Sequence, residues 1–128
     1  MSEATYELVS VEEGKYRIVT EDEEIVLVVH PVLVNVLKKG DKLSFVVNNV
    51  VSVHTNTPKF GPPCSPNMVG SRSAKIKSVE TLSEPKVRAR VEGKVFEVSI
   101  VVTNVSVFPE HRDPFGAPCV IVSTVVLH

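Results

Sequence analysis

Tryptophan and glutamine are absent from this sequence, and aromatic side chains are few, with two tyrosines and five phenylalanines. Single-stranded nucleic acids are usually bound by stacking their bases on aromatic side chains, so this shortage weighs against a nucleic-acid binder. The missing glutamine, beside abundant glutamate and lysine, is typical of proteins from hot environments. We therefore expect a thermophilic source.

Segments for membrane insertion and export are also missing. No apolar run approaches the roughly 20 residues that a membrane-spanning helix needs. The first residues include early acidic side chains and lack the basic-then-apolar order of a secretory signal. These absences predict a cytoplasmic protein that does not associate with membranes.

The signatures of common enzymes are missing as well. The sequence has no glycine-rich phosphate loop and no pair of acids in the setting of an acid–base site. We expect a protein that is not an enzyme, with no catalytic residues and no required cofactor.

Valine dominates what is present and supplies 28 of the 128 residues. Because side chains branched at Cβ lose rotamer freedom in helices and pack well on sheets, this content predicts strands. Short apolar segments separated by turns predict an all-β fold, a single antiparallel barrel domain of about eight strands, similar to an OB-fold, over residues 1–128. The expected strands are residues 5–11, 15–20, 25–30, 43–53, 74–80, 86–92, 95–108 and 119–127.

Two segments interrupt this pattern. A proline at the first position and a glycine beyond the last are typical of a short helix, so we expect a helical turn within residues 31–39, although the valines there favour a strand. Residues 54–73, HTNTPKFGPPCSPNMVGSRS, form a long proline-rich loop. Loops of this length in a compact domain are usually functional or mobile.

One five-residue pattern, Phe-Gly-x-Pro-Cys, occurs twice. It reads FGPPC at residues 60–64 and FGAPC at residues 115–119, a spacing of 55. Each copy follows a similar valine-rich strand that runs out into a loop. We therefore expect the two loops to lie near each other.

The two FGxPC loops also concentrate the residues that could bind a metal. Cys64 and Cys119 end the two motifs, and His54 and His111 precede them. Two thiolates and two imidazoles have the composition of a tetrahedral zinc site, but standard zinc ligands come in tighter pairs. Two separate buried thiols are therefore the first expectation. A Cys64–Cys119 disulfide and a zinc site are the alternatives.

A basic stripe is the other candidate site. Alternate residues of two expected strands are basic and would point to one face of a sheet. The stripe consists of Lys75, Lys77, Lys86, Arg88 and Arg90. A positive face could hold a phosphate backbone or a protein partner, but a solvated outer face is the simpler interpretation.

Charge is unevenly distributed along the chain although the total is −1. Residues 1–24 carry eight acids and two bases, a net charge of −6, while residues 25–128 carry seven acids and twelve bases, a net charge of +5. Such asymmetry can mark an interaction surface, and pairing of the two parts within the molecule explains it equally well.

The order of these elements resembles the small OB-fold subunit that archaeal and eukaryotic RNA polymerases share, the eighth subunit of the eukaryotic enzymes and its archaeal counterpart. The resembling parts are an apolar strand at residues 24–29, GDKLSFVV at residues 40–47, a long variable loop, AKIKSVE at residues 74–80 and KVRARVEGKVFEVSI at residues 86–100. Leu43 stands where the family usually has an aromatic residue. The resemblance implies a non-catalytic subunit that docks on the large polymerase subunits.

Three functions follow from these observations. The first is a non-enzymatic, OB-like module in a larger protein assembly, most concretely an accessory subunit of DNA-directed RNA polymerase. The second is a single-stranded nucleic-acid-binding protein that uses the basic stripe. The third is a structural module stabilised by zinc.

Overall fold

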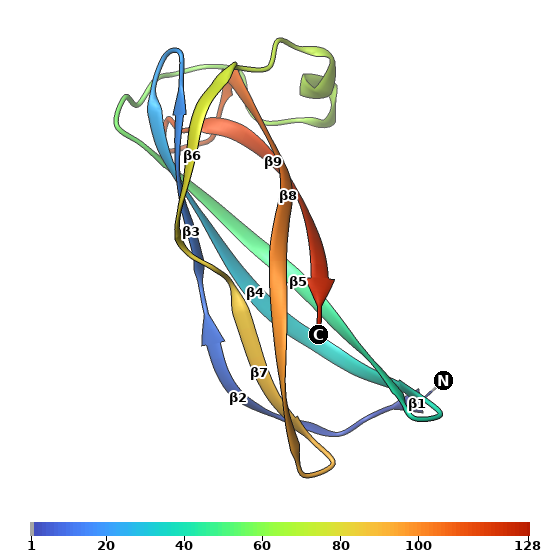
Figure 1. The fold of residues 1–128 in the computed structure, drawn as a ribbon. Coiled ribbons are helices and arrows are strands. Elements are labelled where there is room, and N and C mark those ends of the chain that lie inside the picture. Colours follow the sequence, from blue (N-terminus) through green and yellow to red (C-terminus); the bar gives the residue numbers. More distant parts are fainter. Residues whose placement is uncertain (1) are drawn as a thin grey trace.

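The computed structural model describes residues 2–128 as a mostly antiparallel β structure with one 3₁₀ turn (Figure 1). The elements are β1 Ser2–Glu3, β2 Tyr6–Glu12, β3 Gly14–Thr20, β4 Glu24–Lys39, β5 Lys42–Thr55, η1 Pro66–Gly70, β6 Ile76–Ser83, β7 Lys86–Val91, β8 Lys94–Arg112 and β9 Pro118–Leu127. The predicted all-β, antiparallel class is confirmed.

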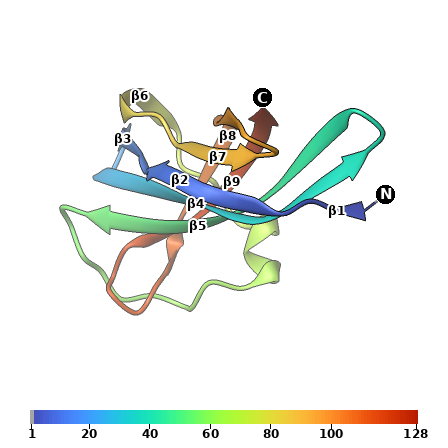
Figure 2. The ribbon, with the colours of Figure 1, turned by 90° about the horizontal axis from the view of Figure 1, so that it is seen from below.

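The strands form two sheets that pack on each other. In the first sheet, β4 pairs with β5 along one side and with β3 and β1 along the other, and β6 pairs with β3. The second sheet has the order β2-β7-β8-β9. The β4–β5 hairpin reaches out to one side, next to the N-terminus (Figure 2).

Two bent segments, each made of two consecutive strands, join the sheets on one side of the molecule. β2 leads into β3, and β6 leads into β7, so that each continuous segment passes from one sheet to the other. Gly14 lies at this bend, and a Cβ atom there would come within 2.6 Å of the Pro85 ring. Glycine is therefore required where the two neighbouring segments approach each other closely.

The opposite side of the molecule is open. β5 and β9 are neighbouring edge strands there, joined by a hydrogen bond of 3.1 Å from Asn49 Nδ2 to Thr124 Oγ1. Within residues 2–128 no backbone ladder links β5 to β9. The two sheets therefore do not close into the barrel that the strand pattern predicts.

Apolar side chains between the sheets form two main clusters. One packs the β4–β5 hairpin against β7 and β8 and includes Val36, Phe45 and Val98. The other packs β3 and β4 against the far half of β8 and includes Ile18, Leu27 and Val107. Burial of these side chains, at about 25 cal/mol per Å² of apolar surface, is the main source of stability.

The expected helical turn at residues 31–39 is wrong, because these residues are the second half of β4. Val32, Val34 and Val36 favour strand, and residues 31–39 pair with β5 across a two-residue turn at Gly40 and Asp41. Pro31 fits because β3 pairs with β4 only up to Val29 and β1 only at Leu37 and Lys38, so at Pro31 the sole partner is β5 and no other strand needs its missing N–H group. The 3₁₀ turn of the structure instead lies in the long loop, at Pro66–Gly70.

None of the helical segments in the described chain has the length and apolar character needed to cross a membrane.

Candidate functional site

The two FGxPC loops lie side by side at one end of the molecule, as their repetition predicts. The backbone N–H of Lys59 donates to Gly116 O over 3.1 Å, and that of Arg112 donates to Pro62 O over 2.8 Å. A disulfide joins Cys64 to Cys119, with their Cα atoms 5.7 Å apart. The expectation of two separate thiols is therefore wrong, and the alternative of a disulfide is confirmed.

A buried ion pair anchors the second loop. Arg112 Nη2 lies 2.7 Å from Glu23 Oε1, and Arg112 Nη1 lies 3.0 Å from Glu23 Oε2. Only 3% of the arginine side chain and none of the glutamate side chain are exposed. A two-bond contact between guanidinium and carboxylate fixes distance and orientation together, so the end of β8 is held firmly against the turn before β4.

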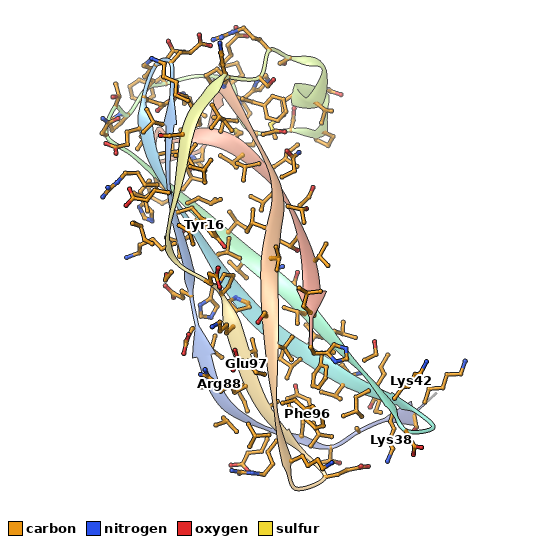
Figure 3. All side chains as sticks on the ribbon, in the orientation of Figure 1. Tyr16, Lys38, Lys42, Arg88, Phe96 and Glu97 are labelled. Atoms are coloured by element: carbon orange, nitrogen blue, oxygen red, sulfur yellow. A yellow bond between two sulfur atoms is a disulfide. The ribbon has the colours of Figure 1, made fainter. Side chains whose placement is uncertain are left out.

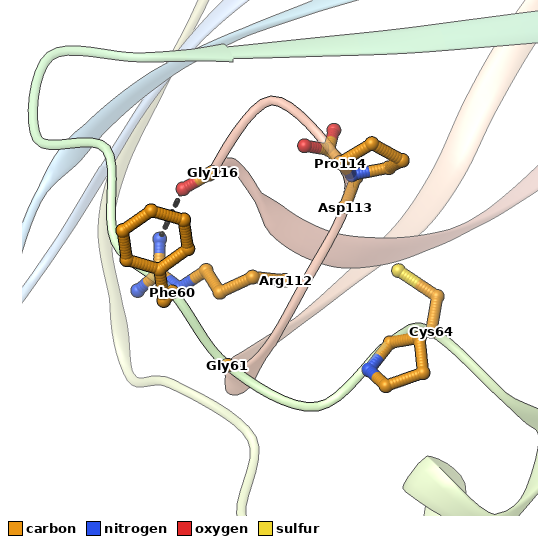
Figure 4. A pocket seen from close by; sticks show the side chains of 8 residues that line it. Phe60, Gly61, Cys64, Arg112, Asp113, Pro114 and Gly116 are labelled. Carbon is orange, nitrogen blue, oxygen red and sulfur yellow. Dashed lines mark hydrogen bonds between the residues drawn. The ribbon is translucent and has the colours of Figure 1, made fainter.

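The remaining polar atoms of this pair are also bonded. Arg112 Nη1 donates to Gly116 O over 3.3 Å, as Figure 4 shows. Arg112 Nε donates to Pro109 O over 2.9 Å. The Thr55 hydroxyl donates to Glu23 Oε2. A buried charge pair whose donors and acceptors are satisfied stays in one geometry. Sequence reasoning missed this pair because Glu23 belongs to an acidic turn and Arg112 to a loop.

The glycines of the two motifs are required by close packing. Gly116 has φ +88°, and a Cβ atom there would lie 3.0 Å from the backbone nitrogen of Lys59. A Cβ atom on Gly61 would lie 2.8 Å from the carbonyl oxygen of Glu110. Each loop therefore approaches the backbone of the other more closely than a residue with a side chain would permit.

The phenylalanines of the two motifs point into solvent. Phe60 and Phe115 are 107% and 87% exposed, although the loops that carry them are held in place. Asp113 Oδ1 accepts bonds from the backbone N–H groups of Phe115, at 2.9 Å, and Ala117, at 3.0 Å. We call Phe60 and Phe115 the phenylalanine tip. A hollow of about 250 Å³ is lined by both of its members.

A larger groove of about 670 Å³ lies beside the tip. Its apolar lining comes from β5, β9, the Cys64–Cys119 bridge and the loop that carries Phe115. Ser52 and His54 also line it, and Ser52 Oγ lies 3.5 Å from His54 Nε2. Both side chains are exposed, and the nearby Asp113 uses a carboxylate oxygen to hold the loop, so this is not the geometry of an activated serine.

The basic stripe is divided between the two sheets. Lys77 lies on β6 and Lys75 just before it, whereas Lys86, Arg88 and Arg90 lie on β7. The structure therefore does not place the five residues on a single sheet face.

The β7 part of the stripe is paired with acids of the neighbouring strands. Arg88 lies between Glu12, at 3.0 Å, and Glu97, at 3.4 Å (Figure 3). The hydrogen bond to Glu12, with the charge of Glu97, raises the pKa of Arg88 above its ordinary value. Arg90 pairs with Glu7 at 2.9 Å.

These pairs explain the uneven charge along the sequence. Acids of the first 24 residues pair with bases far downstream: Glu7 with Arg90, Glu12 with Arg88, Glu21 and Asp22 with Arg72, and Glu23 with Arg112. The charge asymmetry is thus largely balanced within the molecule.

The four residues considered for zinc do not form a zinc site in this fold. The sulfurs of Cys64 and Cys119 are bonded to each other and are not thiolates. His54 is exposed on β5, and His111 lies at the end of β8, with Nδ1 buried and unbonded among the described atoms. No cluster of three or more histidine, cysteine or acidic residues within residues 2–128 is arranged to hold a metal ion.

The chain matches no protein-family model, no curated protein and no solved structure.

Proposed function

We propose that this protein is a non-catalytic docking module and that the phenylalanine tip is its contact surface. The observation that carries the proposal is the combination of two fully exposed aromatic rings with loops fixed by a disulfide and a buried ion pair. Aromatic side chains are enriched at the centres of protein interfaces, and a rigid loop loses little conformational entropy on binding.

The charge arrangement supports a protein partner over a nucleic acid. The arginines of β7 already pair with acids on both neighbouring strands, which lowers their attraction for phosphate. The exposed aromatic rings lie at the loops, and the stripe itself contains none. A bound nucleic acid would thus have to stack its bases at the loops and bind through its phosphates at the stripe, two separate places on the molecule.

The most specific form of the proposal is an accessory subunit of DNA-directed RNA polymerase in the cytoplasm of a thermophile, docked on the large subunits. It rests on the sequence resemblance described above. The bent β2–β3 and β6–β7 segments support an OB-like relationship, because they continue from one sheet to the other as strands of a small barrel do. A cytoplasmic disulfide is typical of hyperthermophilic proteins, which agrees with the absence of glutamine.

Co-purification from the source cells tests this function. The tagged chain is expected to recover the large polymerase subunits in equal molar amounts. A polymerase purified through its largest subunit should contain the chain in return. Active polymerase that lacks the chain would contradict the polymerase assignment while leaving the docking role to be judged by the other proteins recovered.

A further inference from the structure

The edge strands of the two sheets are protected to different degrees. On the bent side, the edge strands β2 and β6 carry charged residues, and both pair with irregular register. On the open side, residues 43–53 of β5 and residues 119–127 of β9 contain no charged residue. Natural edge strands usually carry charges, prolines or bulges that prevent further pairing. The edge strands β5 and β9 on the open side therefore have the composition of strands that pair with a further strand.

β5 is the longer of these two edges and is ready to pair with another strand. Its 14 residues pair only with β4 among the strands in the described chain, and β9 meets it on its inner side at Asn49. The outer face of the hairpin carries exposed valines beside polar residues: Val32, Val34, Val46 and Val50 are between 38% and 55% exposed. An extended segment could thus bond to the free edge of β5.

The sequence of β5 is self-complementary about Asn48. If two copies of β5 pair antiparallel with Asn48 opposite Asn48, then Val46 lies opposite Val50 of the second copy and Ser44 opposite Ser52. All of these side chains lie on the exposed face of the strand. Moving the centre to Asn49 would instead place Val46 opposite Ser52 and Asn48 opposite Val50, which mixes apolar and polar partners.

Two β5 edges are also compatible in charge, and the length of their contact can be calculated. Pairing about Asn48 brings no charged side chain opposite another between residues 43 and 53, so an uncharged edge meets an uncharged edge. The paired length is about 37 Å for these residues. Such a contact buries less than the roughly 800 Å² per partner of a standard interface, so a weak dimer is expected.

We propose that two copies of this chain associate edge to edge through β5, with a twofold axis at Asn48. This pairing would join the two first sheets into one continuous sheet. The paired edge adjoins the phenylalanine tip, because Val51, Ser52 and Val53 line the groove that Phe115 also lines, but the pairing does not depend on the proposed docking function.

Sedimentation equilibrium of the full chain tests the association. A species of twice the 14.0 kDa monomer mass should appear as the concentration rises through roughly 10 to 500 μM. A monomer throughout that range would overturn the proposal.

Two matched variants test which surface is used. Val50→Lys places a charge on the pairing edge and should weaken the dimer by at least about tenfold. Val34→Lys alters an equally exposed valine on the outer face of the neighbouring strand β4, away from the free edge of β5, and should leave association unchanged. Equal loss in both variants, with circular dichroism confirming that both are folded, would show face-to-face association and overturn edge pairing.

A cysteine cross-link tests the register. In Asn48→Cys the two introduced cysteines would face each other across the axis at about 5 Å between Cα atoms, within disulfide range. Mild oxidation should give a covalent dimer on a non-reducing gel. Ser44→Cys is the control, because its own copy would lie about 27 Å away. Dimer from Ser44→Cys but not from Asn48→Cys would overturn the register.

Discussion

The Glu23–Arg112 contact shows how much depends on single residues in this molecule. Both side chains are buried, and each supplies the partner that the other needs. Removing one member of such a pair leaves an uncompensated charge in the interior, which costs far more than loss of a surface ion pair. The pair therefore controls the position of the second FGxPC loop.

Replacing Arg112 by methionine tests this role. Arg112→Met is expected to lower the free energy of unfolding by about 3–5 kcal/mol, because Glu23 would remain buried without its partner. Urea denaturation gives the value. Arg17→Ala, which removes exposed pairs with Glu24 and Glu80, is the control and should cost less than about 1 kcal/mol. Equal effects would show that burial of Glu23 does not matter.

Gly116 offers a second test at single-residue scale. Gly93 has a similar positive φ, +81°, but a Cβ atom there would meet nothing within 4 Å. Gly93→Ala should cost about 1–2 kcal/mol through backbone strain alone. Gly116→Ala should cost more, because its Cβ atom would also press on the backbone of Lys59. The difference between the two unfolding free energies measures the contact between the loops.

At the scale of elements, local sequence predicted most strands and misassigned one. Residues 31–39 carry the end signals of a helix, Pro31 and Gly40, together with the Cβ-branched residues of a strand. The pairing with β5 decides between them, and pairing is a long-range property that local signals do not contain. The repeat of FGxPC did predict the proximity of the loops, because similar strands end in similar places.

The Cys64–Cys119 disulfide is the main covalent link between elements, and it closes a loop of 55 residues. In the chain-entropy model a loop of this size contributes about 4 kcal/mol. The free energy of unfolding of the double variant Cys64→Ser/Cys119→Ser, measured in urea, should therefore be lower by about 4 kcal/mol. Wild-type protein kept reduced should behave like the variant. An unchanged urea midpoint in both samples would show that the disulfide joins two neighbouring loops without stabilising the fold.

At the scale of the whole molecule, composition predicted the fold class but not the closure of the sheets. Valine-rich strands can be assigned from local sequence, whereas closure depends on whether β5 and β9 bond, and both have the composition of paired strands. The charge asymmetry could be calculated from the sequence, but its balance within the fold could not. Predicting that balance requires knowing that β2 and β8 lie beside β7 and bring their acids to its arginines.

That internal balance leads to a prediction about nucleic acids. A labelled single-stranded oligonucleotide should not bind at about 50 mM salt, because the arginines of β7 are already paired. Fluorescence anisotropy measures this directly. Binding that falls steeply between about 50 and 200 mM salt would instead support a role in holding a phosphate backbone.

The most direct test of the docking role compares capture of partner proteins from source-cell extract by three immobilised chains: wild type, Phe60→Ser/Phe115→Ser and Arg88→Ser/Arg90→Ser. We expect the wild type and the arginine variant to retain the same proteins in similar amounts, and the phenylalanine variant, folded and oxidised, to lose them. Retention by the phenylalanine variant with loss by the arginine variant would contradict the assignment of the phenylalanine tip as the contact surface.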